Sequence, residues 1–507
     1  MATSLDPARI AVTDIDGASL STGELAELVR ATALKFEAAE VSHVGYCGTN
    51  GRALPVALFA AATCGIPFVP LNYRLADDQL ADVASRHQLL VVAAEREATR
   101  LRRLGVSHII NPSALLSAGD VDVADEPINH SIDPESVALL LYTSGSTAAP
   151  KAAVLRHRHL TSYVISTVEF ASHTSDDAVL VSVPPYHVAG IMNLLTNLYS
   201  GRRIVYLDPF DPQNWLDMAA REHITHSMLV PTMLARIVDV LGEKVADLPH
   251  LASLAYGGAK MPARVIEKAL RLFPQVAFTN AYGLTETSST IALLGPEAHR
   301  DAVATSDPLI RARLHSVGLP LPGIELEVRT IEHAPCEAGQ VGDIYVRGDQ
   351  IAGEYVGSTV ASDGWFATRD RGYLDQSGFL FIEGRADDTI IRGGENIAPA
   401  EIEEVLLRHE AVVECAVVGI DDEEWGQRIA AAVVLSAGSS VAPDMLKEFA
   451  RSHLRSSKTP DVIALYESLP YTETGKLLRR TVRQQLHEAS TSLSSSTLMG
   501  TINEEGT

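Results

Sequence analysis

Ten residues in the first third of the chain have the composition of a phosphate-binding loop. The segment is Tyr142-Thr143-Ser144-Gly145-Ser146-Thr147-Ala148-Ala149-Pro150-Lys151, directly after the apolar run Val137-Ala138-Leu139-Leu140-Leu141. Backbone N–H groups and hydroxyls can wrap phosphate oxygens, Gly145 lets the main chain approach closely, and Lys151 adds a positive charge. The apolar run predicts a buried strand that leads into this loop. A polar turn between two strands is the alternative interpretation.

The loop does not have the pattern of a Walker P-loop. That motif places glycine directly before the lysine and serine or threonine directly after it, whereas Pro150 and Ala152 flank Lys151 here. A mononucleotide kinase therefore loses support.

Further motifs follow along the chain in a fixed order. They are Pro185-Tyr186-His187-Val188-Ala189-Gly190, Tyr256-Gly257-Gly258-Ala259, Ala281-Tyr282-Gly283-Leu284-Thr285-Glu286-Thr287, Arg369-Asp370-Arg371-Gly372-Tyr373, Glu383-Gly384-Arg385-Ala386-Asp387-Asp388, Arg392-Gly393-Gly394-Glu395-Asn396-Ile397 and Thr474-Gly475-Lys476. Together with the loop, they resemble the adenylate-forming superfamily: acyl- and aryl-CoA ligases, luciferases and the adenylation domains of peptide synthetases. Two departures stand out. Ala148 and Ala152 occupy positions where the family usually has glycine, and Arg369 stands where glycine normally precedes the Asp370 position.

The resemblance implies a site for ATP and Mg²⁺. By resemblance, the loop residues Thr143, Ser144, Gly145, Ser146, Thr147 and Lys151 hold phosphates, and Thr285 contacts the α-phosphate. The Tyr282 ring, with Gly283 beside it, stacks on adenine, and Gly257, Gly258 and Ala259 line the other side of the base. Glu286 is the expected Mg²⁺ ligand, because this hard cation prefers carboxylate and phosphate oxygens. Lys476 is the expected cation between the attacking carboxylate and the α-phosphate; a solvated surface lysine is the alternative.

Other matched residues concern the ribose and the acid. Asp370 is the candidate partner of the ribose hydroxyls, because a carboxylate can accept two hydrogen bonds from a diol. Arg385 adds a second contact, to the ribose or to a phosphate. His187 matches a histidine that borders the acyl pocket of many acyl- and aryl-CoA ligases, although a histidine there can also serve only the backbone. The stretch from Pro184 to Ile191 contains no acidic residue, whereas amino-acid-activating domains usually place an aspartate nearby. A carboxylic acid without an α-amino group is therefore favoured.

The leading hypothesis is an ATP-dependent acid–thiol ligase that makes an acyl-AMP from a fatty or other non-amino acid and passes the acyl group to coenzyme A. By resemblance, a small domain rotates about Asp387 between the half-reactions, and Gly393, Gly394, Glu395 and Asn396 form a loop that gives the thiol access. Two alternatives stay open: a ligase that loads the phosphopantetheine of an acyl carrier protein, and a noncatalytic nucleotide-binding scaffold.

Composition sets outer bounds on the function. The 507 residues carry a net charge of -23, which argues against nonspecific binding to nucleic acid or anionic membranes. The four cysteines are scattered without a CxxC pair, so neither a zinc site nor a disulfide framework is indicated, and a cytoplasmic location is expected.

The start of the chain lacks the pattern of a signal peptide. The apolar run 54–71 is interrupted by Pro55, Gly65, Pro67 and Pro70, which favours a buried helix before a strand over a membrane span. The oligomeric state is not fixed, so a homo-oligomer stays open.

Alternating helical and β-rich patterns predict an α/β fold with layered sheets. We expect an N-terminal AMP-binding domain over 1–386 that includes a small β-barrel-like subdomain from about Val317 onward. A small mobile α+β domain is expected over 387–486, because an amphipathic helix begins near Pro399 and strands follow it. The segment 487–507 is rich in serine and threonine and is expected to be disordered.

Overall fold

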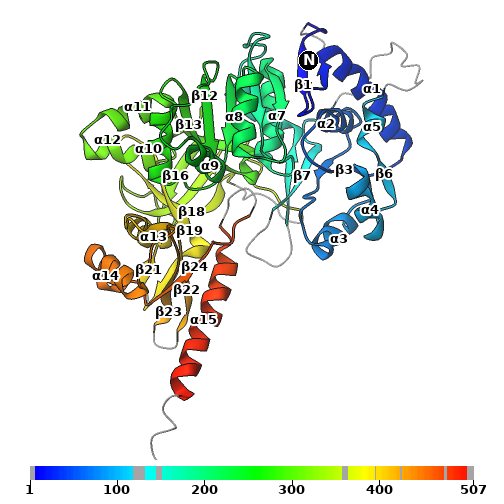
Figure 1. Ribbon diagram of the computed structural model, residues 1–507. Coiled ribbons are helices and arrows are strands. Elements are labelled where there is room, and N and C mark those ends of the chain that lie inside the picture. The colour runs from blue at the N-terminus through cyan, green and yellow to red at the C-terminus, as the bar shows by residue number, and fades with distance from the viewer. Residues whose placement is uncertain are drawn as a thin grey trace, which may run out of the picture. The chain divides into compact units, whose positions relative to one another are not determined.

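The computed structural model describes residues 6–117, 132–143, 151–356, 363–393, 395–422, 425–472 and 477–499, without the side chains of 143, 396 and 490–499. The chain forms two compact units, one made of Met1–Leu326 with Val346–Phe366 and the other of Glu327–Tyr345 with Ala367–Thr507. Helices and sheets alternate in the first, and a smaller set of strands and helices builds the second, which confirms the predicted α/β fold class (Figure 1). The domain boundary at residue 387 stays a prediction.

The larger sheet of the first unit has nine strands in the order β15-β14-β13-β12-β11-β9-β10-β1-β2. Neighbouring strands pair in parallel along the series β1, β10, β9, β11, β12 and β13. At the two ends of this series, β2 pairs antiparallel with β1 and β14 pairs antiparallel with β13. Strand β9, in the interior of the sheet, is buried along its whole length, as expected for a parallel sheet covered on both faces. The strands are β1 (Ile10–Thr13), β2 (Ser19–Ser21), β9 (Ala178–Val181), β10 (Arg203–Tyr206), β11 (His226–Leu229), β12 (Ser253–Gly257), β13 (Ala277–Leu284), β14 (Ser289–Leu294) and β15 (Leu319–Pro320).

A second sheet of the same unit has six strands in the order β6-β5-β3-β4-β7-β8. All neighbouring pairs are parallel except β7 and β8, which form an antiparallel hairpin. The strands are β3 (His43–Cys47), β4 (Phe68–Pro70), β5 (Leu89–Ala93), β6 (His108–Ile110), β7 (Val137–Thr143) and β8 (Lys151–Arg156).

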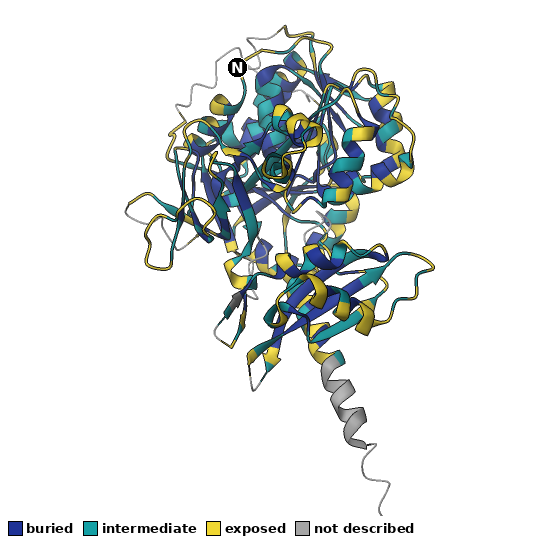
Figure 2. Ribbon diagram, turned by 90° about the vertical axis from the view of Figure 1, so that its left-hand side faces the viewer, coloured by how far each residue is buried: buried dark blue, intermediate teal, exposed yellow. Residues whose placement is uncertain are grey.

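Most helices of the first unit combine buried and exposed residues, whereas the helix Ala53–Thr63 is buried over most of its length (Figure 2). The first of them begins at a capping box in which Ser21 and Glu24 exchange side-chain-to-backbone hydrogen bonds. The helices are α1 (Thr22–Ala38), α2 (Ala53–Thr63), α3 (Asp77–Ser85), α4 (Glu95–Arg103), α5 (Pro112–Leu115), α6 (His157–Thr167), α7 (Val188–Ser200), α8 (Pro212–Arg221), α9 (Pro231–Leu241), α10 (Ala263–Leu272), α11 (Pro296–Ala304) and α12 (Pro308–Ala312), with short 3-10 turns η2 (Thr285–Thr287) and η3 (Arg313–His315).

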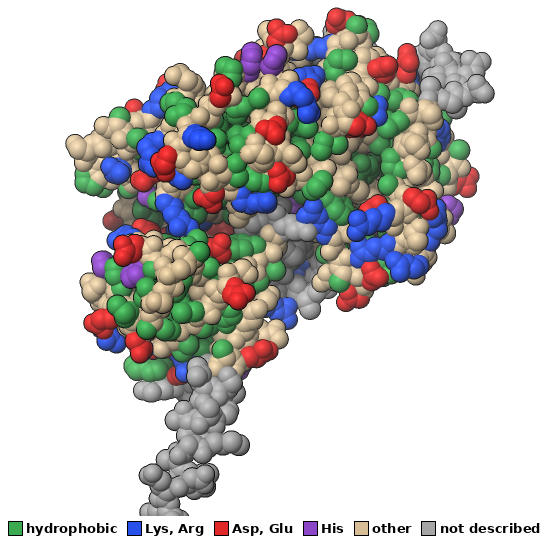
Figure 3. Space-filling view, in the orientation of Figure 1, with side chains coloured by type: hydrophobic (Ala, Val, Ile, Leu, Met, Phe, Trp, Pro, Cys, Tyr) green, Lys and Arg blue, Asp and Glu red, His purple; other side chains and the backbone are tan. Residues whose placement is uncertain are grey.

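The apolar run at 54–71 forms buried helix α2 followed by strand β4, as predicted. Within the described part of the chain, no helix combines the length and apolarity needed to cross a bilayer. The face seen in Figure 3 intersperses acidic, basic and hydrophobic side chains.

The second unit holds smaller sheets. The predicted small β subdomain is a four-stranded sheet in the order β16-β17-β18-β19, and a three-stranded sheet β22-β23-β24 packs with helices in the C-terminal part. The elements are β16 (Glu325–Arg329), β17 (Gly342–Arg347), β18 (Phe366–Leu374), β19 (Leu380–Arg385), η4 (Ala386–Asp388), β20 (Ile390–Arg392), β21 (Glu395–Ile397), α13 (Pro399–Leu407), β22 (Val412–Asp422), β23 (Gly426–Leu435), α14 (Pro443–His453), η5 (Ser456–Lys458), β24 (Val462–Tyr466) and α15 (Arg479–Met499).

Disorder from residue 487 onward stays a prediction, although the last turns of helix α15 fall within this segment. Helix α15 continues to Met499. Its first turns are anchored by the buried side chains Val482 and Leu486, and extending an existing helix costs much less than starting one, even through serine and threonine. Residues 500–507 lie outside the described residues.

Candidate active site

The carboxyl ends of the parallel strands in the nine-stranded sheet gather most of the predicted site residues of the first unit. His187 lies beyond the end of β9, Gly257 ends β12 and Gly258 and Ala259 follow it, and Tyr282 and Gly283 lie at the end of β13. Thr285 and Glu286 form turn η2 directly after β13. Because β9, β11, β12 and β13 are parallel neighbours, these ends share one edge of the sheet, where open α/β sheets bind ligands.

The predicted phosphate loop connects the two strands of a hairpin. Thr143 at the end of β7 pairs with Lys151 at the start of β8, so the loop leaves and re-enters the six-stranded sheet at one point. The Lys151 side chain is exposed. Ser144, Gly145, Ser146 and Thr147 lie outside the described residues, and so does Ala148. Their predicted role stays a prediction.

The backbone geometry itself favours glycine at positions 257 and 258. A methyl group on Gly257 would lie 2.2 Å from the carbonyl oxygen of Ala281 on neighbouring β13. Gly258 has a φ of +84°, a conformation that residues with a Cβ rarely adopt. The resemblance placed these glycines only beside the base; the close approach of two strands and the left-handed turn are further reasons for glycine.

Glu286 is held in a buried turn. Its side chain is 8% exposed, and its carboxylate oxygen Oε1 accepts a hydrogen bond from the hydroxyl of Tyr355. Its backbone carbonyl accepts two more, from the N–H groups of Ala352 and Gly353, at 2.9 Å each. Tyr355 had no predicted role, because a residue 69 positions away in sequence carries no local signal of this contact.

His187 precedes helix α7 and is half-buried among aromatic rings. Its ring centroid lies 4.6 Å from that of Tyr186, which in turn packs edge-on against Tyr73 at 5.5 Å. Burial, helped by the positive charge of Arg74, lowers the pKa of His187 to about 4. The imidazole is therefore neutral at pH 7 and can donate or accept a hydrogen bond without carrying a charge.

An acidic residue does approach this aromatic group, from a segment that the sequence did not single out. Asp208 follows strand β10, and its Oδ2 accepts a hydrogen bond from the N–H of Asn50 at 3.2 Å. Burial raises the pKa of Asp208, against the opposing effects of that hydrogen bond and of Arg74. The local stretch 184–191 holds no acid, but the fold brings one close from elsewhere.

In the second unit, the two predicted ribose contacts are partners of each other. Asp370 on β18 lies opposite Arg385 on β19, and the Arg385 Nη1 atom is 3.1 Å from the Asp370 Oδ1 atom. The Asp370 carboxylate is buried, whereas the preceding Arg369 is exposed and has a φ of 61°. This left-handed conformation explains why glycine suits the position that Arg369 occupies.

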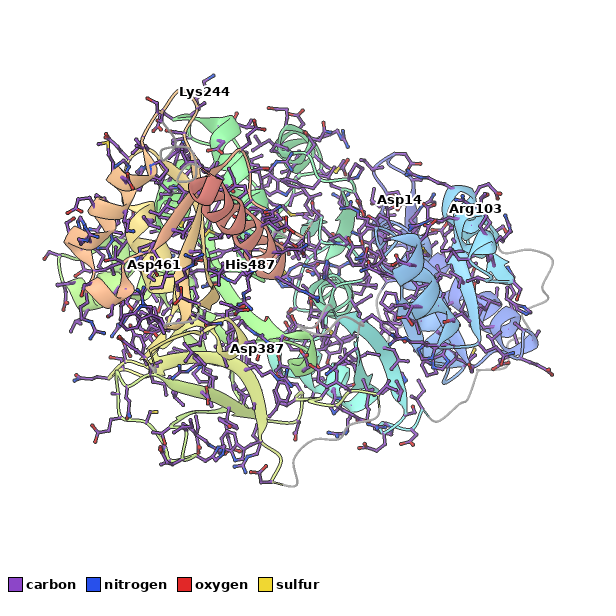
Figure 4. The ribbon with its side chains drawn as sticks, turned by 90° about the horizontal axis from the view of Figure 1, so that it is seen from below. Asp14, Arg103, Lys244, Asp387, Asp461 and His487 are labelled. Atoms are coloured by element: carbon purple, nitrogen blue, oxygen red, sulfur yellow. The ribbon has the colours of Figure 1, made fainter. Side chains whose placement is uncertain are left out.

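Asp387, the predicted hinge, lies in turn η4 between β19 and β20 (Figure 4). Gly393 donates its N–H to the Trp425 carbonyl at 2.8 Å, and Glu395 pairs with Arg455 at 3.1 Å. Gly394 lies outside the described residues, as does the side chain of Asn396. Whether these residues admit a thiol stays a prediction.

Lys476 lies outside the described residues, but its flanks are described. Tyr471 and Leu477 form an antiparallel bridge. Just beyond, Arg479 is held by Glu403, with 2.9 Å between Nη2 and Oε2, and lies 3.5 Å from Asp388. The predicted adenylation lysine, Asp370 and Arg385 thus belong to the second unit, and His187, Tyr282 and Glu286 to the first.

Comparison with known proteins agrees with these motifs. A family model described as AMP-binding enzyme matches residues 2–356, and a model of the AMP-binding enzyme C-terminal domain matches residues 401–476. The chain is similar to a feruloyl-CoA synthase from an Amycolatopsis species, with 32% identity over 92% of this chain and 94% of the relative. It is equally similar, at 32% identity, to an indoleacetate–CoA ligase from Aromatoleum aromaticum, over 92% and 93% of the two chains.

Solved structures give the same result. The o-succinylbenzoate coenzyme A synthetase (MenE) from Bacillus subtilis in complex with ATP and magnesium ion is similar with a TM-score of 0.80 and 26% identity, over 96% of this chain and 98% of that one. ATP-bound MatB from Rhodopseudomonas palustris shares the fold, with a TM-score of 0.84, 24% identity and coverage of 96% and 97%. With the family models matching both parts of the sequence, this chain belongs to the AMP-binding family of adenylate-forming enzymes.

Proposed function

We propose that the protein is an ATP- and Mg²⁺-dependent acid–CoA ligase. The observation that carries this proposal is the common sheet edge at which the strands before His187, Tyr282 and the buried Glu286 end. An aromatic ring for a base, a carboxylate for a cation and an aromatic-lined place with a neutral histidine for an acid are the parts that acyl adenylation needs. The relatives' names, which include CoA ligases for feruloyl, indoleacetate and 2-succinylbenzoate groups, support the same activity.

Two half-reactions follow. In the first, a carboxylate oxygen of the acid attacks the α-phosphorus of ATP, the bond to the β-phosphate oxygen breaks, and pyrophosphate leaves. In the second, the sulfur of coenzyme A attacks the acyl carbonyl carbon, its proton goes to solvent or a base, and AMP leaves. The protein's main task in the first step is to reduce repulsion between two anions, a form of electrostatic catalysis.

Residues of this chain are assigned to that task. We assign Thr285, Lys151 and the hydroxyls of the loop to the phosphates, Asp370 and Arg385 to the ribose, and Lys476 to the attacking carboxylate and the α-phosphate. Glu286 fits a magnesium ion that arrives with ATP, because it is a single buried carboxylate and Mg²⁺ usually keeps phosphate oxygens and waters as its other ligands. The bound ion neutralises phosphate charge.

The substrate is, in this proposal, a carboxylic acid without an α-amino group. Residues 184–191 beside His187 carry no acid, and Asp208 already accepts the Asn50 hydrogen bond. Fatty and aromatic acids both satisfy this requirement. One methylene changes the free energy of discrimination by only about 1–3 kcal/mol, so the choice between them is a matter for a substrate panel.

A second acceptor has a specific observation in its favour. A fatty acid–[acyl-carrier-protein] ligase from Streptomyces coeruleorubidus is 30% identical over 87% of this chain. Under this alternative the thiol is a carrier protein's phosphopantetheine. In either case we propose that the part from 387 to 486 rotates about Asp387 and exchanges Lys476 for the loop Gly393-Gly394-Glu395-Asn396.

The proposal is tested by pyrophosphate release from ATP with a panel of ferulate, indoleacetate, 2-succinylbenzoate, fatty acids of several lengths and amino acids. We expect release with a non-amino acid, followed by AMP and a thioester when coenzyme A is added. Thioester formation only with a phosphopantetheinylated carrier protein would favour the alternative acceptor. A protein that binds ATP but releases no pyrophosphate with any acid would contradict the proposal and support the scaffold.

A further inference from the structure

Segment 352–356 joins two parts of the active site that are distant in sequence. It lies along strand β8, which leaves the predicted phosphate loop, and forms an antiparallel bridge between Ala153 and Tyr355. Two backbone hydrogen bonds flank the bridge, from Val154 N–H to the Glu354 carbonyl at 2.9 Å and from Val356 N–H to the Ala152 carbonyl at 3.0 Å. The segment therefore acts as an extra strand beside the exit of the loop.

The side chain of Glu354 strengthens this attachment. Its carboxylate receives hydrogen bonds from the guanidinium of Arg156, at the end of β8, with Nη2–Oε1 and Nη2–Oε2 distances of 2.8 and 3.0 Å and an Nε–Oε2 distance of 3.1 Å. Paired, charge-assisted contacts of this kind fix geometry as well as adding energy.

The same segment holds Glu286 at both its backbone and its side chain. Ala352 and Gly353 donate their N–H groups to the Glu286 carbonyl, and the Tyr355 hydroxyl donates to Oε1. Among the residues that the structure describes, Oε2 accepts no hydrogen bond, so one oxygen is fixed while the other stays available for a cation. A charge-assisted hydrogen bond of this type restricts the carboxylate's rotation.

The turn around Glu286 needs such support. Ser288 and Ser289 both have positive φ, 54° and 97°, a conformation that costs energy in residues with side chains. The buried amide of Gln350 donates hydrogen bonds to the carbonyls of Thr287 and Thr290, at 3.1 and 2.7 Å, and so spans both serines. Gln350, just before segment 352–356, thus holds both ends of the strained turn.

We propose that Tyr355 is a positioning residue for the Glu286 carboxylate, and that segment 352–356 sets the distance between that carboxylate and the strand that leaves the phosphate loop. The inference rests on the proposed role of Glu286 toward magnesium–ATP. In this arrangement, the strand that leaves the phosphate loop and the Glu286 carboxylate are both hydrogen-bonded to segment 352–356. Losing the Tyr355 hydroxyl frees the carboxylate to rotate while leaving the backbone clamp in place.

The test compares Tyr355→Phe with wild type by calorimetric titration with a nonhydrolysable ATP analogue, with and without Mg²⁺, in the absence of acid and thiol. We expect affinity for the magnesium-bound analogue to fall about tenfold, the scale seen when a group that orients a metal ligand is removed. Affinity for the metal-free analogue should change less than twofold. Tyr345→Phe is the matched control, because the Tyr345 hydroxyl hydrogen-bonds to His333 at 3.3 Å and not to Glu286, and it should behave as wild type.

A double-mutant comparison tests the route of the effect. If Tyr355 acts through Glu286, Tyr355→Phe should add less than a twofold loss of magnesium-dependent affinity to a Glu286→Gln protein. Equal losses with and without Mg²⁺, or full additivity with Glu286→Gln, would overturn the inference in favour of a purely structural role; an unchanged Tyr355→Phe protein would also overturn it. Failure of wild type to bind the analogue at all would instead count against the proposed function.

Discussion

Arg369 offers a sharp test of the backbone geometry beside the proposed ribose contact. Its φ of 61° lies in the left-handed region, which costs a residue with a Cβ roughly 1–2 kcal/mol. Its side chain is exposed and makes no hydrogen bond among the described residues, so removing it should cost little. Replacing it with glycine relieves the left-handed strain but adds roughly 0.5–1 kcal/mol of backbone entropy in the unfolded chain. We therefore expect Arg369→Gly to stabilise the second unit by about 0.7 kcal/mol.

The matched control is Ala367→Gly on the same strand. Ala367 is also exposed and is not among the residues with positive φ, so glycine there should destabilise by about 0.5–1 kcal/mol. Both variants carry the same cost in backbone entropy. The difference between their changes in unfolding free energy therefore gives the cost of the left-handed conformation, about 1–2 kcal/mol. Urea denaturation, with hydrogen exchange of β18 peptides as the local measure, gives both values. If Arg369→Gly destabilises as much as Ala367→Gly, the reasoning from φ is refuted.

Three further predictions concern the site and its support. Glu286→Gln should raise the Mg²⁺ concentration needed for half-maximal pyrophosphate release, because a neutral amide is a poorer ligand for a hard cation; unchanged magnesium dependence would contradict the assignment. Lys476→Ala should slow adenylate formation at least about a hundredfold, or on the order of 3 kcal/mol, while thioester formation from supplied acyl-AMP survives; equal loss in both half-reactions would remove Lys476 from its role. His159 is fully buried, accepts the Arg156 N–H at Nδ1, and has its pKa lowered to about 4 by burial and by the charges of Arg158 and Arg156. The unfolded chain therefore binds this proton first as the pH falls below about 6.5, and stability drops towards pH 4. From pH 7 to 4.5, wild type should lose about 2–3 kcal/mol more than His159→Asn, which keeps an acceptor; equal losses in urea melts would show that His159 does not titrate as described.

Local patterns predicted much of the fold. Strands β5, β6 and β24 coincide with the short β-rich runs Leu89–Ala93, His108–Ile110 and Val462–Tyr466 of the sequence, and helix α13 begins at Pro399, as the N-terminal proline indicated. These elements have strong local signals, because they are buried apolar runs or amphipathic helices with recognisable starts.

Contacts between distant segments could not be predicted in this way. The hydrogen bond from Tyr355 to Glu286, and the approach of Asp208 to the aromatic group at His187, depend on the order of strands in the sheets. The conformation of Arg369 was equally hidden, since an arginine gives no sign of a left-handed φ. Motif order indicated which residues matter, and the fold supplies the partners that position them.

The central claim is that the acid's carboxylate attacks the α-phosphorus of ATP. It is tested most directly by turnover of a substrate acid labelled with oxygen-18 in both carboxylate oxygens, with mass spectrometry of the nucleotide and phosphate products. In this mechanism one carboxylate oxygen bridges to phosphorus and stays with it when the thiol takes the acyl group, so the account predicts AMP carrying one heavy oxygen per turnover and unlabelled pyrophosphate. Label in inorganic phosphate together with ADP, or AMP without label, would contradict it.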